Sequence, residues 1–511
     1  MKDTATAMLC VGEQTVRAPV GVTLLSVLRD QAPGAAQALD TPCGGDGRCG
    51  KCRVMARGAL SAPDAAEKRV LAPAALTDGW RLACRARILG DATVTLPIAA
   101  ARQIRTDGYM PAFTPSPMYA RYGVAVDIGT TTLAAQLCGE GACLAAASAL
   151  NPQAGFGADV ISRIGYALSG PAQAAALAAS VREGIAGLCR QLCAEAAVPA
   201  TAVDALVLTG NTAMLYLLTG RDPACLSAAP FTAEHLFDET LPAEALQLPF
   251  PGARVVLPPC ISGFVGADIV TALLASDICA RPETALLVDI GTNGEIALWH
   301  DGRLLCCSTA AGPAFEGAGI EMGMGGKAGA VDHVTVNGGA LVAHTVGGGA
   351  PVGICGSGLV DALACLLETG QLSETGLLAG GRAVIAPPVA LTQRDVRMAQ
   401  LAKSAVCAGI ETAVARRGLS YADVQSFCVA GGFGSYVHME NAGRIGLIPR
   451  ALVPVTRVLG NAALSGAVML LQNTAFLGDV RHIAAAAETL ELSTSPAFAA
   501  AYVDGMLFPE A

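Results

Sequence analysis

Four cysteines near the N-terminus have the residue types and spacing of an iron–sulfur site. Cys43, Cys49 and Cys52 lie in one loop, TPCGGDGRCGKC, and Cys84 follows after 31 intervening residues. Three thiolates from one loop with a distant fourth are typical ligands of such a cluster, although the first interval is one residue longer than in plant-type ferredoxins. A chain that wraps a cluster needs unusual dihedrals and amides that point at sulfur, which glycine supplies. The glycines of this loop are Gly44, Gly45, Gly47 and Gly50. We therefore predict that the four cysteines hold one cluster.

Other interpretations of this loop explain less of it. Structural zinc usually takes two paired CxxC knuckles, and here only Cys49 and Cys52 form one. The run GDGRCGK, residues 45–51, resembles a P-loop, but Cys52 stands where Ser or Thr would bind magnesium. Four unrelated buried thiols would not require the glycines.

Two Asp-Gly-Thr motifs farther along the chain have the composition of phosphate-binding hairpins. The segments VAVDIGTTTLAAQL (124–137) and LLVDIGTNGEIALW (286–299) align without gaps at an interval of 162 residues. In each, an apolar strand leads to an Asp that can hold Mg²⁺ through water, and to a turn whose N–H groups and hydroxyls can bind phosphate. One such motif is common in ordinary turns, but two copies predict two similar lobes that face each other. The candidate residues are Asp127, Gly129, Thr130 and Thr131, and Asp289, Gly291, Thr292 and Asn293.

A glycine-rich turn nearer the C-terminus is a candidate nucleoside-binding segment. The sequence SFCVAGGFGSYVHMENA runs from an apolar strand into a turn that contains Gly431, Gly432, Gly434 and Ser435. Missing side chains would let a nucleoside lie against the backbone. An ordinary tight connection between a strand and a helix stays open as the alternative.

Three parts of the chain must position these residues. Short alternating runs around one helical stretch, residues 24–31, predict a small mixed α/β domain over residues 1–97. A cluster of prolines resists helix and central strand, so residues 98–121 are predicted to form a linker. Apolar runs then alternate with Ala-rich helical stretches, which predicts an α/β domain with covered sheets. The repeat divides that domain into lobes 122–282 and 283–511.

The composition argues against a nucleic-acid-binding, membrane or secreted protein. A net charge of −9 and a pI near 5.3 disfavour nucleic-acid binding by counterion release. The mean hydropathy of +0.49 comes largely from Ala and Gly. The longest uncharged stretch, residues 458–478, contains Asn461, Ser465, Gln472 and Asn473, so we predict a buried helix there and no membrane association. The N-terminus lacks the pattern of a signal peptide, which predicts a cytoplasmic location. The eighteen Cys are then expected to be in a reducing compartment, as thiols or metal ligands rather than disulfides.

Residues 1–97 resemble the 2Fe-2S ferredoxins, in particular those with five residues between the first two ligands. This resemblance implies an α+β, β-grasp fold that holds one 2Fe-2S cluster. The two hairpins and the glycine-rich turn, in this order, resemble the superfamily of acetate kinase, sugar kinases, heat-shock chaperones and actin. That resemblance implies an α/β domain of two ribonuclease-H-like, actin-like lobes that close over ATP and Mg²⁺. The hairpins would contact the phosphates, and the glycine-rich turn, with Ser435, would contact the adenosine.

Four further segments narrow the resemblance to one family. NPQAGFGADVISRI (151–164), LTGNTAM (208–214), GPAFEGA (312–318) and GICGSGLVD (353–361) are similar to signatures of the ATP-dependent reductive activators of corrinoid proteins. This resemblance implies ATP-driven electron transfer from the cluster to a Co(II) corrinoid, which gives the Co(I) needed for methyl transfer. It implies Asp127 and Asp289 as catalytic residues, a cobalamin-binding partner protein and an external electron donor. The oligomeric state stays open, with a homodimer as one option.

One departure and three alternative functions remain at this point. Longer members of the family carry an additional small domain between ferredoxin and ATPase, and here only the linker separates them. The alternatives are a 2-hydroxyacyl-CoA dehydratase-type ATP-driven electron activator, a small-molecule kinase with a fused ferredoxin, and a ferredoxin joined to a nucleotide sensor without turnover. The dehydratase activators carry their cluster on the ATPase domain, between subunits, which a separate N-terminal ferredoxin argues against.

Several other polar residues receive no assigned role. Asp268 and Glu295 could position a water for hydrolysis, but exposed turn or helix positions explain them equally well. The histidines show no HxxxH or HxxE spacing, so none is assigned to a metal. They are His235, His300, His333, His344, His438 and His482.

Overall fold

The computed structural model describes residues 5–12, 14–32, 39, 45, 47, 50–96, 106–157, 159–229 and 231–510. The chain forms two compact units, one of residues 1–101 with 150–181 and the other of residues 102–149 with 182–511. The segment 150–181 thus groups with the N-terminal unit, although it lies within the predicted first lobe. Among the described residues, no helix has the length and apolar character needed to cross a membrane.

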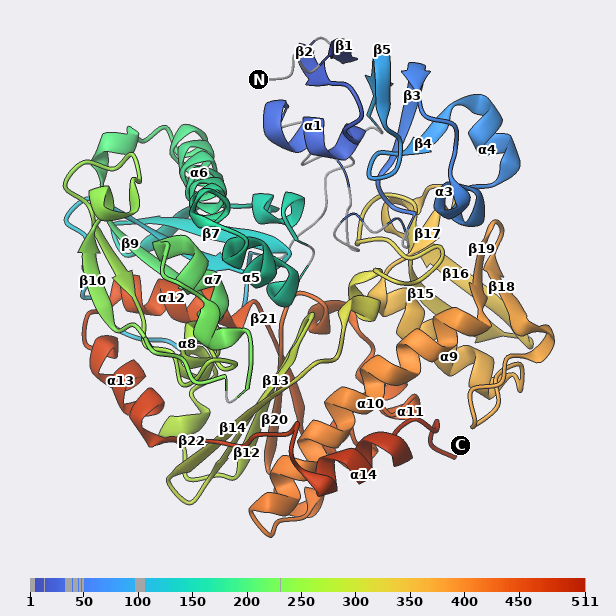
Figure 1. Ribbon diagram of the computed structural model, residues 1–511. Coiled ribbons are helices and arrows are strands. Elements are labelled where there is room, and N and C mark those ends of the chain that lie inside the picture. Colours follow the sequence, from blue (N-terminus) through green and yellow to red (C-terminus); the bar gives the residue numbers. More distant parts are fainter. Residues whose placement is uncertain are drawn as a thin grey trace. The chain divides into compact units, whose positions relative to one another are not determined.

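The N-terminal unit contains a mixed five-stranded sheet and short helices (Figure 1). The elements of its residues 5–96 are β1 (Thr6–Val11), β2 (Gln14–Pro19), α1 (Leu24–Gln31), β3 (Arg53–Leu60), α3 (Ala65–Val70), α4 (Pro73–Asp78), β4 (Trp80–Leu82) and β5 (Ile88–Thr95). The strand order is β2-β1-β5-β3-β4, with β1 and β5 parallel. The Thr23 side chain caps α1 by accepting the Ser26 N–H at 3.3 Å. α1 then buries Leu24, Leu25 and Leu28 in the core of this unit. The predicted α+β fold is confirmed.

Residues 122–276 contain the first Asp-Gly-Thr hairpin. Their elements are β6 (Tyr122–Ile128), β7 (Thr132–Gly139), β8 (Ala142–Leu150), α5 (Val160–Leu168), α6 (Pro171–Glu195), β9 (Val203–Gly210), α7 (Thr212–Thr219), β10 (Glu239–Pro242), β11 (Arg254–Leu257) and α8 (Ala267–Ser276). The strands form one sheet in the order β10-β11-β9-β6-β7-β8.

Residues 285–504 contain the second hairpin and most of the remaining elements. These are β12 (Ala285–Ile290), β13 (Gly294–His300), β14 (Arg303–Thr309), β15 (Ala330–Asn337), β16 (Ala340–Thr345), β17 (Gly353–Ile354), α9 (Gly356–Glu368), β18 (Arg382–Ala386), β19 (Val389–Thr392), α10 (Gln393–Arg416), β20 (Ser426–Ala430), α11 (Met439–Arg444), β21 (Thr456–Gly460), α12 (Ala462–Gln472), α13 (Phe476–Ala486), β22 (Ala487–Thr489) and α14 (Pro496–Asp504). The main sheet has the order β21-β20-β12-β13-β14-β22.

The two six-stranded sheets repeat one arrangement around the Asp-bearing strand. β6 pairs antiparallel with β7 and parallel with β9. In the second sheet, β12 pairs antiparallel with β13 and parallel with β20. Asp127 and Asp289 therefore occupy equivalent positions, one residue before the end of the central strand and next to its hairpin turn. The predicted pair of α/β lobes is confirmed.

Two buried helices, α8 and α12, join the sheets. A Cβ at Gly466 of α12 would lie only 1.9 Å from the carbonyl oxygen of Thr271 in α8, so the helices cross in direct contact. Residues of both helices and both sheets share one apolar core. The stretch 458–478 is thus buried in large part, but the prediction of a single helix is wrong. Asn461 starts α12 by accepting the Leu464 N–H, and the helix ends before Asn473.

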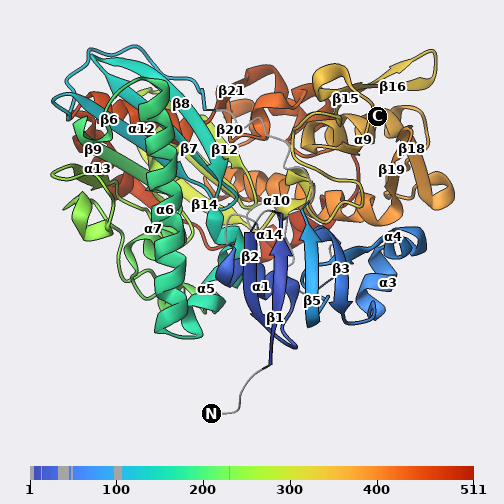
Figure 2. The same cartoon turned by 90° about the horizontal axis from the view of Figure 1, so that it is seen from above.

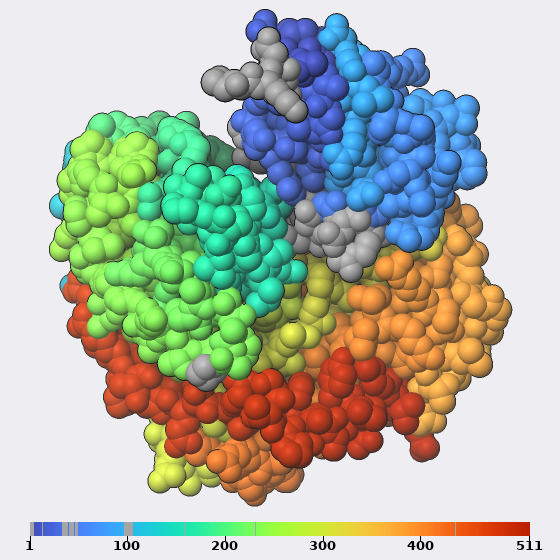
Figure 3. Space-filling view, in the orientation of Figure 1, coloured from blue at the N-terminus to red at the C-terminus, as the bar shows by residue number. Residues whose placement is uncertain are grey.

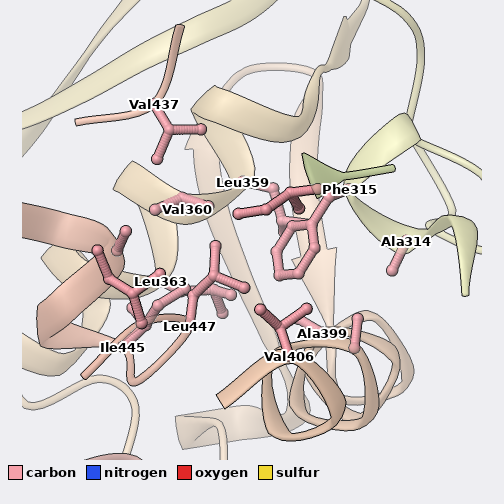
Figure 4. Packing of buried hydrophobic residues seen from close by; sticks show 14 of the residues in the cluster. Ala314, Phe315, Leu359, Val360, Leu363, Ala399, Val406, Val437, Ile445 and Leu447 are labelled. Atoms are coloured by element: carbon pink, nitrogen blue, oxygen red, sulfur yellow. The ribbon is translucent and has the colours of Figure 1, made fainter. Parts of the chain in front are cut away.

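The rest of the second lobe is built around α9 and α10. Figure 1 shows the sheet β16-β15-β17 and the hairpin β18-β19 beside α9, and Figure 2 shows β15, β16, β18 and β19 from above. In the core of this lobe, Phe315 lies beside Leu359 of α9 and Val406 of α10, and Leu363 belongs to the same buried cluster (Figure 4). In the space-filling view of Figure 3, C-terminal residues, in red, form a band that runs along both lobes. The second lobe thus has a dense core directly behind Phe315.

The described part of the predicted linker, residues 106–121, forms no named helix or strand, as its prolines predict. It is nevertheless packed along the second unit. The Tyr109 N–H donates to the Leu459 carbonyl, the Met118 N–H donates to the Leu471 carbonyl, and Met118 is buried. Phe113 and Phe476 make an edge-to-face contact at 5.2 Å. Backbone pairing and aromatic burial therefore fix this segment against β21, α12 and α13.

Candidate functional site

One pocket of about 510 Å³ lies between the two Asp-Gly-Thr hairpins of the second unit. All eight candidate residues of the hairpins line it, as do Gly431 and Gly432 of the glycine-rich turn. The volume lies within the range of roughly 300–1,000 Å³ that is usual for small-molecule sites. The structure thus brings the three predicted motifs together around one cavity.

In the described part of the chain, six carboxyl groups line this pocket, and burial raises the pKa values of four of them, Asp127, Asp268, Asp289 and Glu295. Asp289 on β12 and Glu295 on β13 lie directly opposite each other, an arrangement that repulsion between like charges disfavours. Burial raises the pKa of Asp127 to about 6. Burial and then the Asp127 carboxylate raise the pKa of Asp289 to about 7 and that of Asp268 to about 8. Burial, with the Asp268 and Asp289 carboxylates, holds the pKa of Glu295 well above its ordinary value. A divalent cation would stabilise the ionised form of this cluster.

Asp268 and Glu295 are not the exposed positions that the sequence suggested. Glu295 is 9% exposed, and Asp268 lies half-buried in the first turn of α8, where its carboxylate accepts the Ile269 N–H at 2.8 Å. Both side chains reach the same cavity as the hairpin aspartates. They are therefore candidates for orienting water or metal at the phosphates.

Glu316 joins the two hairpins through one carboxylate. Its Oε2 accepts the Thr131 hydroxyl at 2.8 Å, and its Oε1 accepts the Thr292 hydroxyl at 2.7 Å. The two threonines come from opposite lobes, so this carboxylate bridges them. A phosphate that bound these hydroxyls would have to replace the Glu316 oxygens.

Two asparagines at helix N-termini support the hairpins. The Asn461 Oδ1 caps α12, while its Nδ2 donates to the Asp127 carboxylate at 3.0 Å. The Asn211 Oδ1 caps α7 by accepting the Met214 N–H, while its Nδ2 donates to the Thr130 hydroxyl at 3.1 Å. Each amide thus fixes one hairpin residue to the start of a helix.

The glycine-rich turn contributes Gly431 and Gly432, with Phe433 and Tyr436, to the pocket wall. The Phe433 ring stacks on that of Phe315, with centroids 5.1 Å apart. Gly434 is not among the lining residues. A Cβ there would lie 2.7 Å from the Val429 side chain, so this glycine permits close packing on β20. The side chain of Ser435 lies outside the described part of the structure.

We expect Gly431→Ala to weaken nucleotide binding and Gly432→Ala to change it little. Gly431 has φ +93°, and its Cβ would lie 2.6 Å from Asp289 Oδ1. A non-glycine residue in such a conformation costs roughly 1–3 kcal/mol, and the new methyl would also displace the aspartate. A Cβ at Gly432 meets no atom within 4 Å. Nucleotide affinity by titration calorimetry and unfolding midpoints compare the two variants. Equal losses in both would contradict the assigned role of Gly431.

The cysteine loop of the N-terminal unit is described in part. Cys43, Cys49 and Gly44 lie outside the described residues. Cys52 and Cys84 are buried, with their sulfur atoms 3.3 Å apart. Two thiolates on one tetrahedral metal, at about 2.3 Å each, would lie roughly 3.8 Å apart. The two sulfurs therefore lie close enough to become ligands of one metal if they separate by about half an ångström. The Ala83 N–H donates to the Cys52 carbonyl at 2.8 Å and holds the two segments together.

The described glycines of this loop have the conformations expected of a cluster-binding loop. Their φ angles are +107° at Gly45, +76° at Gly47 and +66° at Gly50, a region that other residues rarely adopt. The glycines therefore serve the backbone path, as the sequence predicted, and the residues present fit a 2Fe-2S cluster.

Sequence reasoning missed several residues of the pocket. Glu316 lies in the quoted segment GPAFEGA, and Asn211 in LTGNTAM, but neither received a role. Their contacts join residues 185 and 81 positions apart, which no local spacing reveals. The local signal for Glu316 was an acidic residue in a short segment that begins with Gly312 and in which Gly317 follows it directly.

Models of known protein families match the N-terminal domain and both lobes, in the order in which they occur in the chain. A model of the 2Fe-2S iron-sulfur cluster binding domain matches residues 9–89, one of the RACo middle region matches 122–281, and one of the C-terminal ASKHA domain of RACo matches 283–511. The corrinoid activation enzyme RamQ of Eubacterium limosum is 33% identical over 420 residues, which cover 76% of this chain and 70% of RamQ.

One further relative and one solved structure indicate the same family. The Co(II) methylated amine-specific corrinoid protein reductase of Methanosarcina barkeri is 32% identical over 269 residues, or 48% of this chain and 50% of that protein. The solved structure of a reductive activator for corrinoid, iron-sulfur protein is 26% identical, with a TM-score of 0.71 over 98% of both chains. This chain therefore belongs to the family of reductive activators of corrinoid proteins.

Proposed function

We propose that this protein uses ATP to drive an electron from its 2Fe-2S cluster to the Co(II) corrinoid of a partner protein, giving Co(I) for methyl transfer. The observation that carries the proposal is the presence, on one chain, of a ferredoxin domain and a two-hairpin pocket with the carboxylates of an ATPase site. The activator and reductase named above, which resemble this chain, act on corrinoid proteins.

We assign the ATP site to the pocket between the hairpins. The turns after Asp127 and Asp289 would present N–H groups and threonine hydroxyls to the phosphates, and the two aspartates would hold Mg²⁺. Gly431 and Gly432 would lie against the adenosine. In the described structure, Thr131 and Thr292 donate to Glu316, so phosphate binding would release this carboxylate toward the cavity. Asp268, Glu295 or the freed Glu316 would then orient the attacking water.

Cysteines 43, 49, 52 and 84 would hold the cluster, which supplies one-electron transfer at a potential near about −400 mV for the plant type. Each ~100 mV by which the acceptor lies below that value costs about 2.3 kcal/mol for one electron. ATP would offset this cost through conformation. If the ATP-bound lobes bind the partner better without its lower axial cobalt ligand, they shift the partner toward the form that is easier to reduce.

Other parts of the assignment are also proposals. They include the domain boundaries 1–97, 98–121 and 122–511, the external electron donor and the cytoplasmic location, while the oligomeric state stays open with a homodimer as one option. None of them alters the chemistry assigned to the pocket or to the cysteines.

The proposal predicts that a Co(II) corrinoid partner stimulates ATP hydrolysis by this protein. Coupling between two sites is reciprocal, so a nucleotide that changes partner affinity requires a partner that changes nucleotide affinity. Phosphate release measured with and without the partner, under anaerobic conditions, tests this. A small-molecule kinase would instead phosphorylate an added substrate without any protein partner. A rate that no corrinoid protein changes would contradict the proposed function.

A further inference from the structure

Three residues from separate parts of the second lobe converge outside the nucleotide pocket. They are His333 on β15, Asp361 on α9 and His438, the residue that precedes α11. One potential ligand atom from each lies within 4.8 Å of the other two. Their distance in the sequence hides this group, which is why histidine spacing alone gave no signal.

The group is arranged around one buried carboxylate. Asp361 is fully buried. Its Oδ2 lies 3.0 Å from His333 Nδ1 and 3.1 Å from His438 Nδ1. Two ligand atoms that each lie about 2.0–2.2 Å from one metal ion are separated by roughly 3.0–3.5 Å. Both contacts are hydrogen bonds in this structure, and the same nitrogen–oxygen separations also suit neighbouring ligands on one ion.

The surroundings supply the support that metal ligands require. The Asn441 Nδ2 donates to Asp361 Oδ1 at 2.7 Å, and the Val334 N–H lies 3.3 Å from Oδ2. These contacts fix the carboxylate, as outer groups do in metal sites. The His333 and His438 rings stack with centroids 4.4 Å apart. Their side chains are 31% and 53% exposed, so an ion and water ligands have a path from solvent.

We propose that His333, Asp361 and His438 form a binding site for a divalent transition-metal ion, with water in the remaining positions. Two imidazole nitrogens and one carboxylate oxygen suit ions of the Zn²⁺ or Fe²⁺ type rather than Mg²⁺ or Ca²⁺, which prefer oxygen ligands only. The site is separate from the cysteines and from the carboxylates that line the ATP pocket.

The ion would connect three elements that also border the ATP pocket. Asp332, next to His333 on β15, lines that pocket, as do the first residues of α9, Gly356 and Ser357. The segment that leads to His438 contributes Tyr436. A bound ion would therefore hold β15, α9 and the start of α11 at a fixed separation behind the pocket wall.

Zinc titration of the cluster-loaded protein without nucleotide tests the proposal. Wild type is expected to bind one equivalent of Zn²⁺ that His333→Gln and His438→Gln each weaken by at least about a hundredfold. Asn441→Ala should weaken it by about 10–100-fold, the usual effect of losing an outer-shell partner. His482→Gln, at an exposed histidine of α13, is the matched control and should bind as wild type does. Because His438 is half exposed, its variant is expected to fold normally, which the unfolding midpoint checks.

Zinc-edge X-ray absorption of the loaded protein identifies the ligands. The proposal predicts a nitrogen and oxygen shell with imidazole scattering, which disappears in His438→Gln. A sulfur shell would mean that zinc binds cysteines. That result, or an undiminished zinc equivalent in both histidine variants, would overturn the proposal.

Discussion

Asp289→Asn is expected to lower ATP turnover at least a hundredfold while leaving the visible spectrum of the cluster unchanged. Removing one preorganised electrostatic group from an active site typically costs about 10²–10³ in rate. Asn has nearly the shape of Asp, so the pocket is preserved while the charge that would hold Mg²⁺ is lost. Asp301→Asn is the matched control, because Asp301 is a solvent-exposed acid in the turn after β13 of the same sheet. Undiminished hydrolysis in Asp289→Asn would contradict the shared site.

The same variant should also change the pH dependence of stability. Burial raises the pKa of Asp127, Asp289 and Asp268 to about 6, 7 and 8. Between about pH 4 and pH 8 the folded protein therefore holds protons that the unfolded chain has released. The contribution of these groups to the free energy of unfolding is then largest at the acidic end of this window, and it decreases as the pH rises through these pKa values.

Without nucleotide and divalent cations, Asp289→Asn should thus unfold at a higher temperature than wild type at pH 8. The gain should shrink toward pH 5, where Asp289 is protonated in the wild-type protein. Thermal unfolding at both pH values measures the difference. A variant that is less stable at pH 8 would mean that Asp289 makes a favourable structural contact as an anion.

Cys84→Ser is expected to remove the cluster and all corrinoid reduction while ATP hydrolysis continues. Cys84 is buried beside Cys52, and its loss would leave the iron that the two would share with only one thiolate ligand. Cys10→Ser is the matched control in the same domain, because the Cys10 sulfur lies near the Thr15 hydroxyl on the β1-β2 hairpin. Iron analysis should give about two irons per chain in wild type and in the control.

The contrary outcomes for this variant are specific. Two irons and an unchanged spectrum in Cys84→Ser would exclude Cys84 as a ligand. Four irons per wild-type chain, or stoichiometric zinc, would contradict the type of cluster. Loss of ATP hydrolysis together with the cluster would mean that the two sites do not function independently.

The sequence predicted those features that local patterns encode. The ungapped repeat around Asp127 and Asp289 predicted two matching sheets, because a strand, a hairpin turn and a second strand are consecutive in the chain. The described glycines of the cysteine loop, Gly45, Gly47 and Gly50, were predicted for the same reason, since each has a positive φ that a local turn requires. Gly431 was also predicted from a local pattern, the glycine-rich turn after an apolar strand, and it lines the pocket.

Contacts between distant elements could not be predicted in this way. Glu316 bridges Thr131 and Thr292 only because the two lobes fold toward each other. Asp268 lies at the start of an apolar helix, and only the packing of α8 on the sheet brings it to the pocket. The packing of the predicted linker could not be foreseen, because its partners, Leu459 and Leu471, lie more than three hundred residues later. Each of these positions depends on tertiary packing.

The central claim is that ATP drives an electron from this protein to cobalt, and anaerobic visible spectroscopy of a cobalamin-loaded partner tests it directly. The partner in its Co(II) state is mixed with this protein and a reductant that alone cannot produce Co(I). With ATP and Mg²⁺ the Co(I) spectrum should appear, and without nucleotide it should not. Formation of Co(I) at the same rate with and without ATP, or its absence in both, would contradict the account.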